Sequence, residues 1–380
     1  WHVTNATNVI DAYQLAPADV TQATSAGLNV ALVLGRANDP TALLNENWGT
    51  RQETLAELGQ NGTLWSTYGA DQALYDKVAS ELKTTYGLKI LDGTDSAAYG
   101  DYVSSAASRT IWVELDTAAQ FESLFGTTLY QSTQSGNEFA FWNGNLFLPE
   151  EWNIQGLWFD TENVPPPSNL TPGVSTTLPQ GAQSPGNLST LGLDLSPAEI
   201  AKLYNFPLIG QDVATGPIGL IEPGIGSALP ADQTKTFQQL LTEYLASVGQ
   251  SGTGQVKVQG ANGQSYDQGG AGERSLDVGV VASVNPNSDI YLFNGSGYNG
   301  NADASTFTAI QSALWDPTLR AAVLSSSFGD DQSMSPNSPF YQAYRQLQID
   351  AALKNVTLFN ALGDGGSGNE TGNGLTNLAY

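Results

Sequence analysis

Short apolar runs alternate with helix-length stretches through the second half of the chain, and this alternation constrains the fold most. Runs such as IGLI at 218–221, DIYLF at 289–293 and VTLF at 356–359 carry no polar alternation. Strands of this kind are buried on both faces, and the helices between them are the crossovers that parallel strands require. We therefore predict a parallel, doubly wound α/β sheet in this region.

Polar and aromatic side chains follow the ends of these predicted strands. In a doubly wound sheet, ligands bind beyond the carboxyl ends of the strands. The residues at these ends are Glu222, Asn294, Phe328 and Asp364. Asp364 lies in GDGGSG, among small residues that let another chain approach closely. The motif alone leaves a catalytic aspartate, a turn aspartate and a metal-loop aspartate open, although the EF-hand order is absent.

The first 160 residues follow another pattern. NVALVL at 29–34 and IWVEL at 111–115 predict strands, and the second leads into the amphipathic AAQFESLFG. FAFWNGNLFLP predicts two aromatic-rich strands around an Asn143–Gly144 turn, and GLWFD predicts one more. Without a regular βαβ repeat, we expect a compact antiparallel sheet with helices on one face.

Residues 163–195 separate the two patterns. Pro, Ser, Thr, Gly and Asn dominate this segment, which is too poor in apolar residues to pack and too long for an ordinary loop. We predict that it links two units, residues 1–162 and residues 196–380. Such a linker is either a spacer or an exposed processing segment.

The charge balance limits the partners. The net charge is −24, from 13 Lys and Arg against 37 Asp and Glu. This excess repels phosphate backbones and anionic lipid, so we expect neither nucleic acid nor a membrane as a partner. A carboxylate excess suits a protein that works in acid, and it equally serves solubility.

The residue types also limit the chemistry. Cys is absent, which excludes disulfides and thiolate catalysis, and His2 is the only histidine. A Ser-His-Asp triad needs a positioned imidazole, which a histidine beside a chain end does not readily provide. Acid–base work must therefore fall to carboxylates, which serve as bases in acid.

The segment GERSLDVGVVASV at 272–284 carries two such acids. On a helix, Glu273 and Asp277 lie four residues apart on one face. The same face continues through three apolar positions, Val280, Val281 and Val284. Like charges at this spacing disfavour a helix, and burying them is costly unless they share a proton or have partners. The alternative is a Glu that complements the helix dipole beside an incidental Asp.

Several motifs together resemble one family. They are LYNFP at 203–207, IGLIEPG at 218–224, the Glu-x-x-x-Asp helix, LSSSFG at 324–329 and ALGDGGSG at 361–368. Their order resembles that of the sedolisin and kumamolisin family of serine-carboxyl peptidases, and IWVELDTAAQFESLFG and NLFLPEE resemble its pro-domain. The resemblance implies a ferredoxin-like α+β inhibitory pro-domain at 1–162, activation cleavage in the linker at 163–195, and the N-terminal part of a subtilisin-like peptidase domain at 196–380.

The resemblance also implies roles for individual residues. Glu273 matches the general base, and Asp277 matches the acid that orients it. Asp364 matches the aspartic acid that donates to the oxyanion while protonated. Glu222 matches an outer carboxylate of the proton network. Phe328 stands where the family commonly has Trp, so an indole hydrogen bond is lost there.

Other family features are missing from the sequence. It holds neither the Gly-Thr-Ser segment of the nucleophile nor the aspartate-rich calcium loop. The resemblance implies calcium with ligands beyond residue 380, none in this chain, and a C-terminal remainder of the catalytic domain supplied separately. It further implies a secreted, extracellular, acid-active zymogen that hydrolyses proteins or peptides and is inhibited by its own pro-domain.

Two alternatives remain open at this point. One is a non-catalytic relative that ends near residue 380 and acts as a binding or inhibitory module. The other is a glycosidase, in which two carboxylates flank a sugar bond. Acids four apart on one helix lie ~5–6 Å apart and point the same way, so they do not readily straddle a substrate. Side-chain preference and endo- versus tripeptidyl action are not encoded in these motifs.

Overall fold

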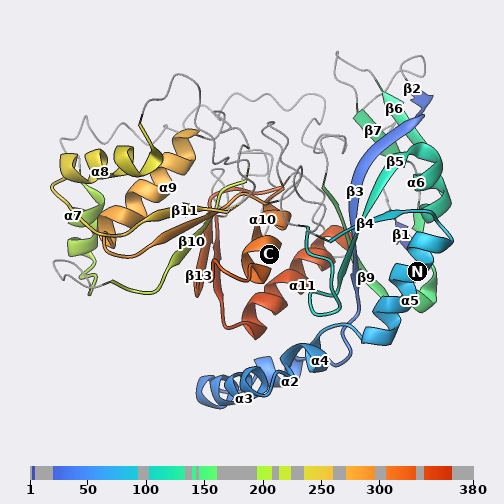
Figure 1. The fold of residues 1–380 in the computed structure, drawn as a ribbon, viewed down its shortest axis with the longest axis horizontal. Coiled ribbons are helices and arrows are strands. Elements are labelled where there is room, and N and C mark those ends of the chain that lie inside the picture. Colours follow the sequence, from blue (N-terminus) through green and yellow to red (C-terminus); the bar gives the residue numbers. More distant parts are fainter. Residues whose placement is uncertain are drawn as a thin grey trace, which may run out of the picture.

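The computed structural model describes residues 2–4, 20–92, 102–132, 139–142, 145–160, 195–207, 214–223, 235–259, 271–295, 305–330 and 338–361. Within these residues the chain forms an N-terminal part built on antiparallel strands and a C-terminal part built on a parallel sheet (Figure 1). Residues 161–194, which include all of the predicted linker at 163–195 except Leu195, lie outside the described residues.

Within the described residues, the N-terminal part contains a four-stranded sheet, a three-stranded sheet and a two-stranded sheet, all antiparallel, with helices between the strands. Its strands are β1 (His2–Thr4), β2 (Val20–Gln22), β3 (Ser25–Leu34), β4 (Lys89–Leu91), β5 (Thr110–Thr117), β6 (Leu129–Ser132), β7 (Phe139–Trp142), β8 (Asn145–Phe147) and β9 (Ile154–Asp160). Its helices are α2 (Thr41–Leu44), α3 (Trp48–Gln60), α4 (Leu64–Tyr68), α5 (Gln72–Thr84), α6 (Ala118–Phe125) and the 3₁₀ turn η3 (Glu150–Trp152). The main sheet has the order β4-β5-β3-β9. With α5 and α6 as crossovers, this is the connectivity of a ferredoxin-like βαββαβ unit.

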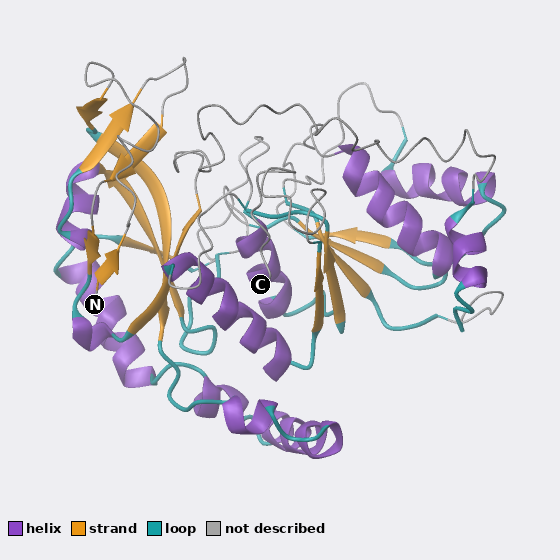
Figure 2. Cartoon of the chain, turned by 180° about the vertical axis from the view of Figure 1, so that it is seen from behind, coloured by secondary structure: helices purple, strands orange, loops and turns teal. Residues whose placement is uncertain are grey.

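Strand β3 explains why the apolar run at 29–34 is continuous although the sheet is antiparallel. All five residues from Val30 to Leu34 are buried. Helices α5 and α6 cover one face of the sheet, and α10 and α11 of the C-terminal part cover the other (Figures 1 and 2). The expectation of helices on one face is therefore incomplete, because a second helical layer buries the opposite face.

The two aromatic strands predicted around residues 143–144 exist, but they pair elsewhere. Strand β7 pairs with β6, whereas β8 pairs with β1, so they belong to two different sheets. The turn residues Asn143 and Gly144 lie outside the described residues. The interpretation of this segment as one local unit is wrong, because more distant strands supply both sets of backbone partners.

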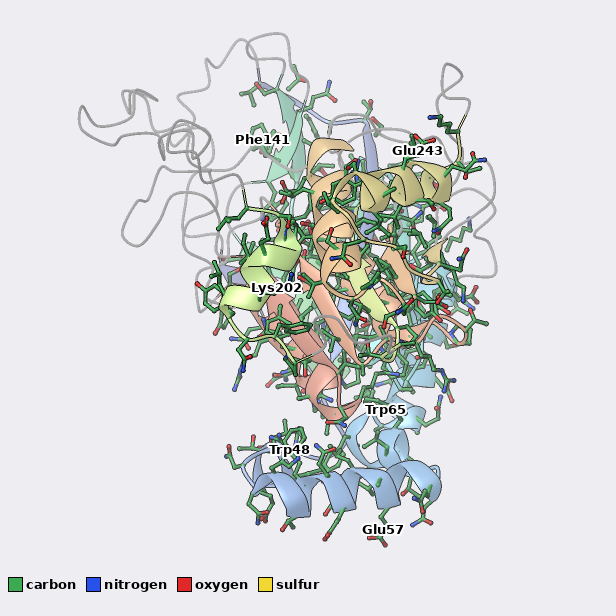
Figure 3. The ribbon with its side chains drawn as sticks, turned by 90° about the vertical axis from the view of Figure 1, so that its left-hand side faces the viewer. Trp48, Glu57, Trp65, Phe141, Lys202 and Glu243 are labelled. Carbon is green, nitrogen blue, oxygen red and sulfur yellow. The ribbon has the colours of Figure 1, made fainter. Side chains whose placement is uncertain are left out.

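Helices α2, α3 and α4 form an arm that the sequence patterns did not predict. Trp65 of α4 lies between this arm and the rest of the molecule, whereas Glu57 of α3 points away from it (Figure 3). The Trp65 and Trp315 ring centroids are 4.7 Å apart, and the Lys354 ammonium lies 3.9 Å from the Trp315 ring centroid. This aromatic contact joins the arm to the helices beside the parallel sheet.

The C-terminal part is the predicted parallel sheet. Its strands are β10 (Ile218–Ile221), β11 (Val256–Val258), β12 (Ile290–Phe293), β13 (Val323–Ser326) and β14 (Thr357–Asn360). Its helices are α7 (Pro197–Leu203), α8 (Phe237–Ser247), α9 (Ala271–Val284), α10 (Thr306–Trp315) and α11 (Pro339–Leu353). All four strand pairs are parallel, in the order β11-β12-β10-β13-β14.

Alternating side chains of the parallel strands divide between two cores. Leu220 and Leu292 pack with α8 and α9 on one face, whereas Ile221 and Phe293 pack with α10 and α11 on the other. The sheet is therefore doubly wound, as its continuous apolar strands predict. The face covered by α10 and α11 belongs to the same core cluster as the N-terminal sheet.

The N-terminal sheet meets helix α11 at an interface that we call the seam. It is closely packed and contains buried charged side chains. A Cβ added to Gly156 of β9 would lie 2.7 Å from the backbone nitrogen of Ala343 in α11, so glycine is required for this approach. Arg36 and Arg109 each reach the buried Asp350 carboxylate, at 2.7 and 3.1 Å. The two parts therefore share one interior. Among the described helices, none is long and apolar enough to cross a membrane.

Candidate active site at the carboxyl edge of the parallel sheet

The site lies where the chain changes direction across the parallel sheet. From β10 the chain crosses through α8 to β11 on one side, whereas from β13 it crosses through α11 to β14 on the other. The carboxyl ends of the neighbouring strands β10 and β13 thus form a topological switch point, where ligands bind in such sheets. Glu222 follows β10, and Ser327 and Phe328 follow β13.

Glu222 is held at this edge by its backbone and is fully buried. Its N–H donates to the Phe293 carbonyl at 2.8 Å, which extends the pairing of β10 and β12 by one residue. Neither carboxyl oxygen has a hydrogen bond of good geometry from a described residue, although the Asp277 carboxyl is close enough to interact. Burial raises the pKa of Glu222 to about 9, the charge of Asp277 adds to this rise, and Arg274 opposes it. Glu222 is therefore neutral in acid and at neutral pH.

Asp277 projects from the second turn of α9 toward the same edge. It is half-buried, and its Oδ1 accepts a hydrogen bond of 3.0 Å from the Ser327 hydroxyl. Burial raises the pKa of Asp277, while the hydrogen bonds from Ser327 and Glu222 oppose the rise. A neutral Glu222 can donate its proton toward an ionised Asp277, so the two acids behave as a pair with one proton.

Arg274 is buried near Glu222, whose pKa its charge lowers. Its guanidinium is 1% exposed, one Nη2–H donates to the Pro223 carbonyl, and its Cζ lies 5.5 Å from the Phe328 ring centroid. The Ser326 hydroxyl accepts from the Phe328 N–H at 3.3 Å and donates to the Phe328 carbonyl at 3.0 Å. These two bonds shape the turn after β13 and fix the ring against the guanidinium.

The buried face of α9 is shifted from the predicted stripe. Arg274, Val278 and Ala282 are buried, whereas Glu273 is exposed and Val280 is 40% exposed. Positions 274, 278 and 282 follow the helical spacing of four, and they place Glu273 at the rim of this face. The extension of the stripe through Val280 is therefore wrong, since Val280 lies on the outer side of the helix.

The structure brings together some of the sequence-predicted residues. Asp277 and Arg274 both lie near Glu222, the Phe328 ring lies against Arg274, and Glu273 is exposed on the same helix as Asp277. Asp364 lies outside the described residues, so a site shared by all three acids stays a prediction. Asn294 is buried directly after β12.

Sequence reasoning missed Arg274 and Ser327. The signal for Arg274 was its position four residues before Val278 on an apolar helix face, where an arginine needs a polar neighbour. Ser327 was part of the quoted LSSSFG motif, but the choice among three serines depends on the turn after the strand. That turn directs the Ser326 hydroxyl to its own backbone and the Ser327 hydroxyl to Asp277.

The described residues offer no calcium site. No group of three or more Asp, Glu, His or Cys side chains among them could hold a metal ion. The calcium implied by the resemblance therefore has no donor set in the described part of the chain.

Fold and site together define an α/β protein with an acidic side-chain network at the switch point of a parallel sheet. No protein-family model matches the chain. A 190-residue stretch, 49% of this chain, is 32% identical to "Kumamolisin" from Bacillus sp. (strain MN-32). The match spans 32% of that relative's length. This similarity supports a relationship to the sedolisin and kumamolisin family, as the motif order indicates.

Proposed function

We propose that this chain is the pro-region and the first half of the catalytic domain of an acid-active serine-carboxyl endopeptidase zymogen. The observation that carries the proposal is the half-buried Asp277, which accepts from Ser327 beside a neutral Glu222 at the switch point of the sheet. The similarity of half the chain to kumamolisin supports the same chemistry. Proteins and peptides are the proposed substrates.

In the proposed reaction, a serine hydroxyl from polypeptide beyond these 380 residues attacks the peptide carbonyl. Glu273 takes the proton of the attacking hydroxyl and returns it to the leaving amine, while Asp277 orients Glu273. The protonated Asp364 donates a hydrogen bond to the oxyanion that develops on the carbonyl oxygen. The exposed position of Glu273 suits this role, because a base must be accessible to the nucleophile and the substrate.

The proposed zymogen is secreted, and residues 1–162 act as its inhibitory pro-domain. Acid starts cleavage within residues 163–195, the longest segment with too few apolar residues to pack. Mass spectrometry of the acid-treated complete protein measures the new termini. Termini found only within residues 196–380 would contradict cleavage in the linker.

The pH profile of the complete protein tests the catalytic roles. Glu273 must be ionised and Asp364 protonated, so kcat/KM is expected to follow an acid bell. Asp364→Ala removes the oxyanion donor, and kcat should fall by about 10²–10³-fold. Asp364→Asn keeps a donor that does not titrate, so the alkaline limb should move to higher pH.

A matched control is Asp289→Asn. Asp289 is an acid that pairs with Lys257 at the amino end of β12, on the opposite edge of the sheet, so kcat/KM should not change. Full activity at neutral pH, or an unchanged alkaline limb in Asp364→Asn, would show that Asp364 is a turn residue. If the complete protein binds peptides in acid without cleaving them, the alternative of a non-catalytic binding module would be supported instead.

A further inference from the structure

Two serines at the carboxyl end of β13 use their hydroxyl groups differently, and the proposed reaction assigns neither a role. The Ser326 hydroxyl accepts from the Phe328 N–H at 3.3 Å and donates to the Phe328 carbonyl at 3.0 Å. The Ser327 hydroxyl lies 3.0 Å from Asp277 Oδ1 on α9. The first serine therefore closes the turn, and the second connects the turn to the helix that carries the acids.

The direction of the bond between Ser327 and Asp277 follows from its chemistry. An ionised carboxylate has no proton, so the hydroxyl is the donor in this pair. A hydrogen bond to the charged form of an acid favours that form. Both residues are half-buried, so fewer water molecules compete for the carboxylate than at an exposed site. Ser327 therefore favours an ionised Asp277 over a protonated one.

Other titratable groups near Asp277 come from three elements. Glu222, after β10, is close enough to donate to Asp277 while it is protonated, and burial raises its pKa to about 9. On α9 itself, Glu273 and Arg274 lie four and three positions before Asp277. The acid farther along the turn after β13, Asp330, accepts from the first two N–H groups of α10.

Helices α7 and α8 also pack against α9. Tyr244 of α8 lies beside Gly279, which faces nearly the opposite way from Asp277 on the helix. The charged residues of α7 and α8 are all exposed, and they are Glu199, Lys202 and Glu243. The groups that act on Asp277 through hydrogen bonds are therefore the Ser327 hydroxyl and the Glu222 carboxyl.

We infer that Ser327 is a positioning residue: its hydroxyl, directed to α9 by the turn after β13, holds the Asp277 carboxyl in one orientation and favours its ionised form. The neighbouring side chain in the turn, Phe328, has no polar hydrogen that could take this part. The consequence for catalysis rests on the proposed function, because an ionised Asp277 is the group that would orient Glu273. The effect of the hydroxyl on Asp277 does not itself depend on peptidase activity.

Carbon-13 NMR of the complete protein, labelled at the aspartate carboxyl carbons, measures the titration of Asp277. The signal is assigned by its loss in Asp277→Asn. In Ser327→Ala the donor is gone, so the midpoint should rise by about half to one pH unit, a roughly three- to tenfold higher proton affinity. A midpoint that does not rise would overturn the inference. The same comparison in a Glu222→Gln background, where Asp277 titrates without a partner acid, should give a rise of the same sign.

Two further variants separate the hydroxyl from packing. Ser327→Thr keeps a hydroxyl at the same position, so its midpoint should stay within about 0.3 pH units of the parent. A rise as large as the one expected for Ala would overturn the inference. The matched control is Ser283→Ala on the same helix as Asp277, which removes a buried hydroxyl that donates to the Gly279 carbonyl at 2.6 Å. Its midpoint should not change, and a rise equal to that of Ser327→Ala would also overturn the inference.

Activity distinguishes this inference from the proposed function. An NMR midpoint that rises in Ser327→Ala in a protein without peptidase activity would support the inference and contradict the peptidase. If the protein is an active peptidase, the acid limb of kcat/KM should move to higher pH in Ser327→Ala by the same shift as the NMR midpoint, and Ser327→Thr should restore it. An acid limb that stays in place while the midpoint moves would overturn the catalytic part alone.

Discussion

Two buried acids, Asp350 in the seam and Glu222 at the edge of the parallel sheet, are stabilised in opposite ways. Asp350 is 2% exposed and accepts from Arg36 and Arg109 at 2.7 and 3.1 Å. Glu222 is fully buried beside another carboxyl and a single guanidinium, and its pKa rises to about 9. Asp350 therefore keeps its charge by ion pairing, whereas Glu222 loses its charge by binding a proton. A permanent ion pair stabilises the contact between the two parts, and a group that holds a proton is suited to acid–base chemistry.

The largest expected effect comes from breaking the pairing in the seam. Asp350→Asn leaves two buried guanidinium groups without their shared anion, so the free energy of unfolding should fall by about 3–5 kcal/mol. Urea unfolding monitored by tryptophan fluorescence measures this loss. The control is Glu243→Gln, which breaks the exposed pair with Lys235 and should cost less than about 1 kcal/mol. Equal losses in the two variants would refute the structural role of Asp350.

The second prediction concerns the proton on Glu222. Its pKa is 4.5 in the unfolded chain and about 9 in the folded protein, so the folded state binds more protons between these values. The contribution of this proton to the free energy of unfolding is therefore fully present below pH 4.5 and is lost as the pH rises toward 9. Glu222→Gln is neutral at every pH and should remove a slope of up to about 1.4 kcal/mol per pH unit.

Unfolding free energies of both proteins at pH 5, 7 and 8.5 measure this slope. The two proteins should be similar at pH 5, and the Gln variant should be the more stable one at pH 8.5. Parallel stability curves across this range would mean that Glu222 is already ionised at pH 5, and that the contrast with Asp350 is wrong.

The smallest expected effect tests whether packing, as well as charge, holds the seam. Gly156→Ala places a methyl group 2.7 Å from the Ala343 nitrogen, and such overpacking should cost about 1–3 kcal/mol. Gly59→Ala in α3 is the control, because a Cβ there would meet nothing within 4 Å. It should be neutral or stabilise by up to about 1 kcal/mol. Thermal unfolding compares the stabilities of the two variants. An unchanged unfolding temperature in Gly156→Ala would show that the backbones of β9 and α11 move apart at little cost.

The sequence predicted the parallel sheet well because four of its five strands, β10, β12, β13 and β14, carry their own signal. IGLI, DIYLF and VTLF are apolar without alternation, and the helices between them begin at recognisable caps such as Ser305 and Ser338. Strand β11, with Lys257 at its centre, was missed because three residues at a sheet edge carry little pattern. The arm of α2, α3 and α4 was missed because its main contacts, such as Trp65 with Trp315, join distant residues.

The site was predictable in part for the same reason. Glu222 and Phe328 follow strands, so topology places them, and Asp277 follows from helical spacing. The predicted buried side of α9 was wrong by one position, because the acids at 273 and 277 define a stripe directly beside the one that carries Arg274. A single helix does not reveal which of two neighbouring stripes faces the sheet. That choice depends on α8, whose Leu241 and Leu245 pack against Val278 and Ala282.

The shared interior has a consequence for the order of events during synthesis. Arg36 and Asp350 are 314 positions apart, yet they close the same seam. One face of the N-terminal sheet, including Trp158 on β9, meets its covering helices only after residue 353 has left the ribosome. At ordinary translation rates the delay after β9 is on the order of tens of seconds. During that interval a nascent chain presents a broad apolar surface that chaperones can bind.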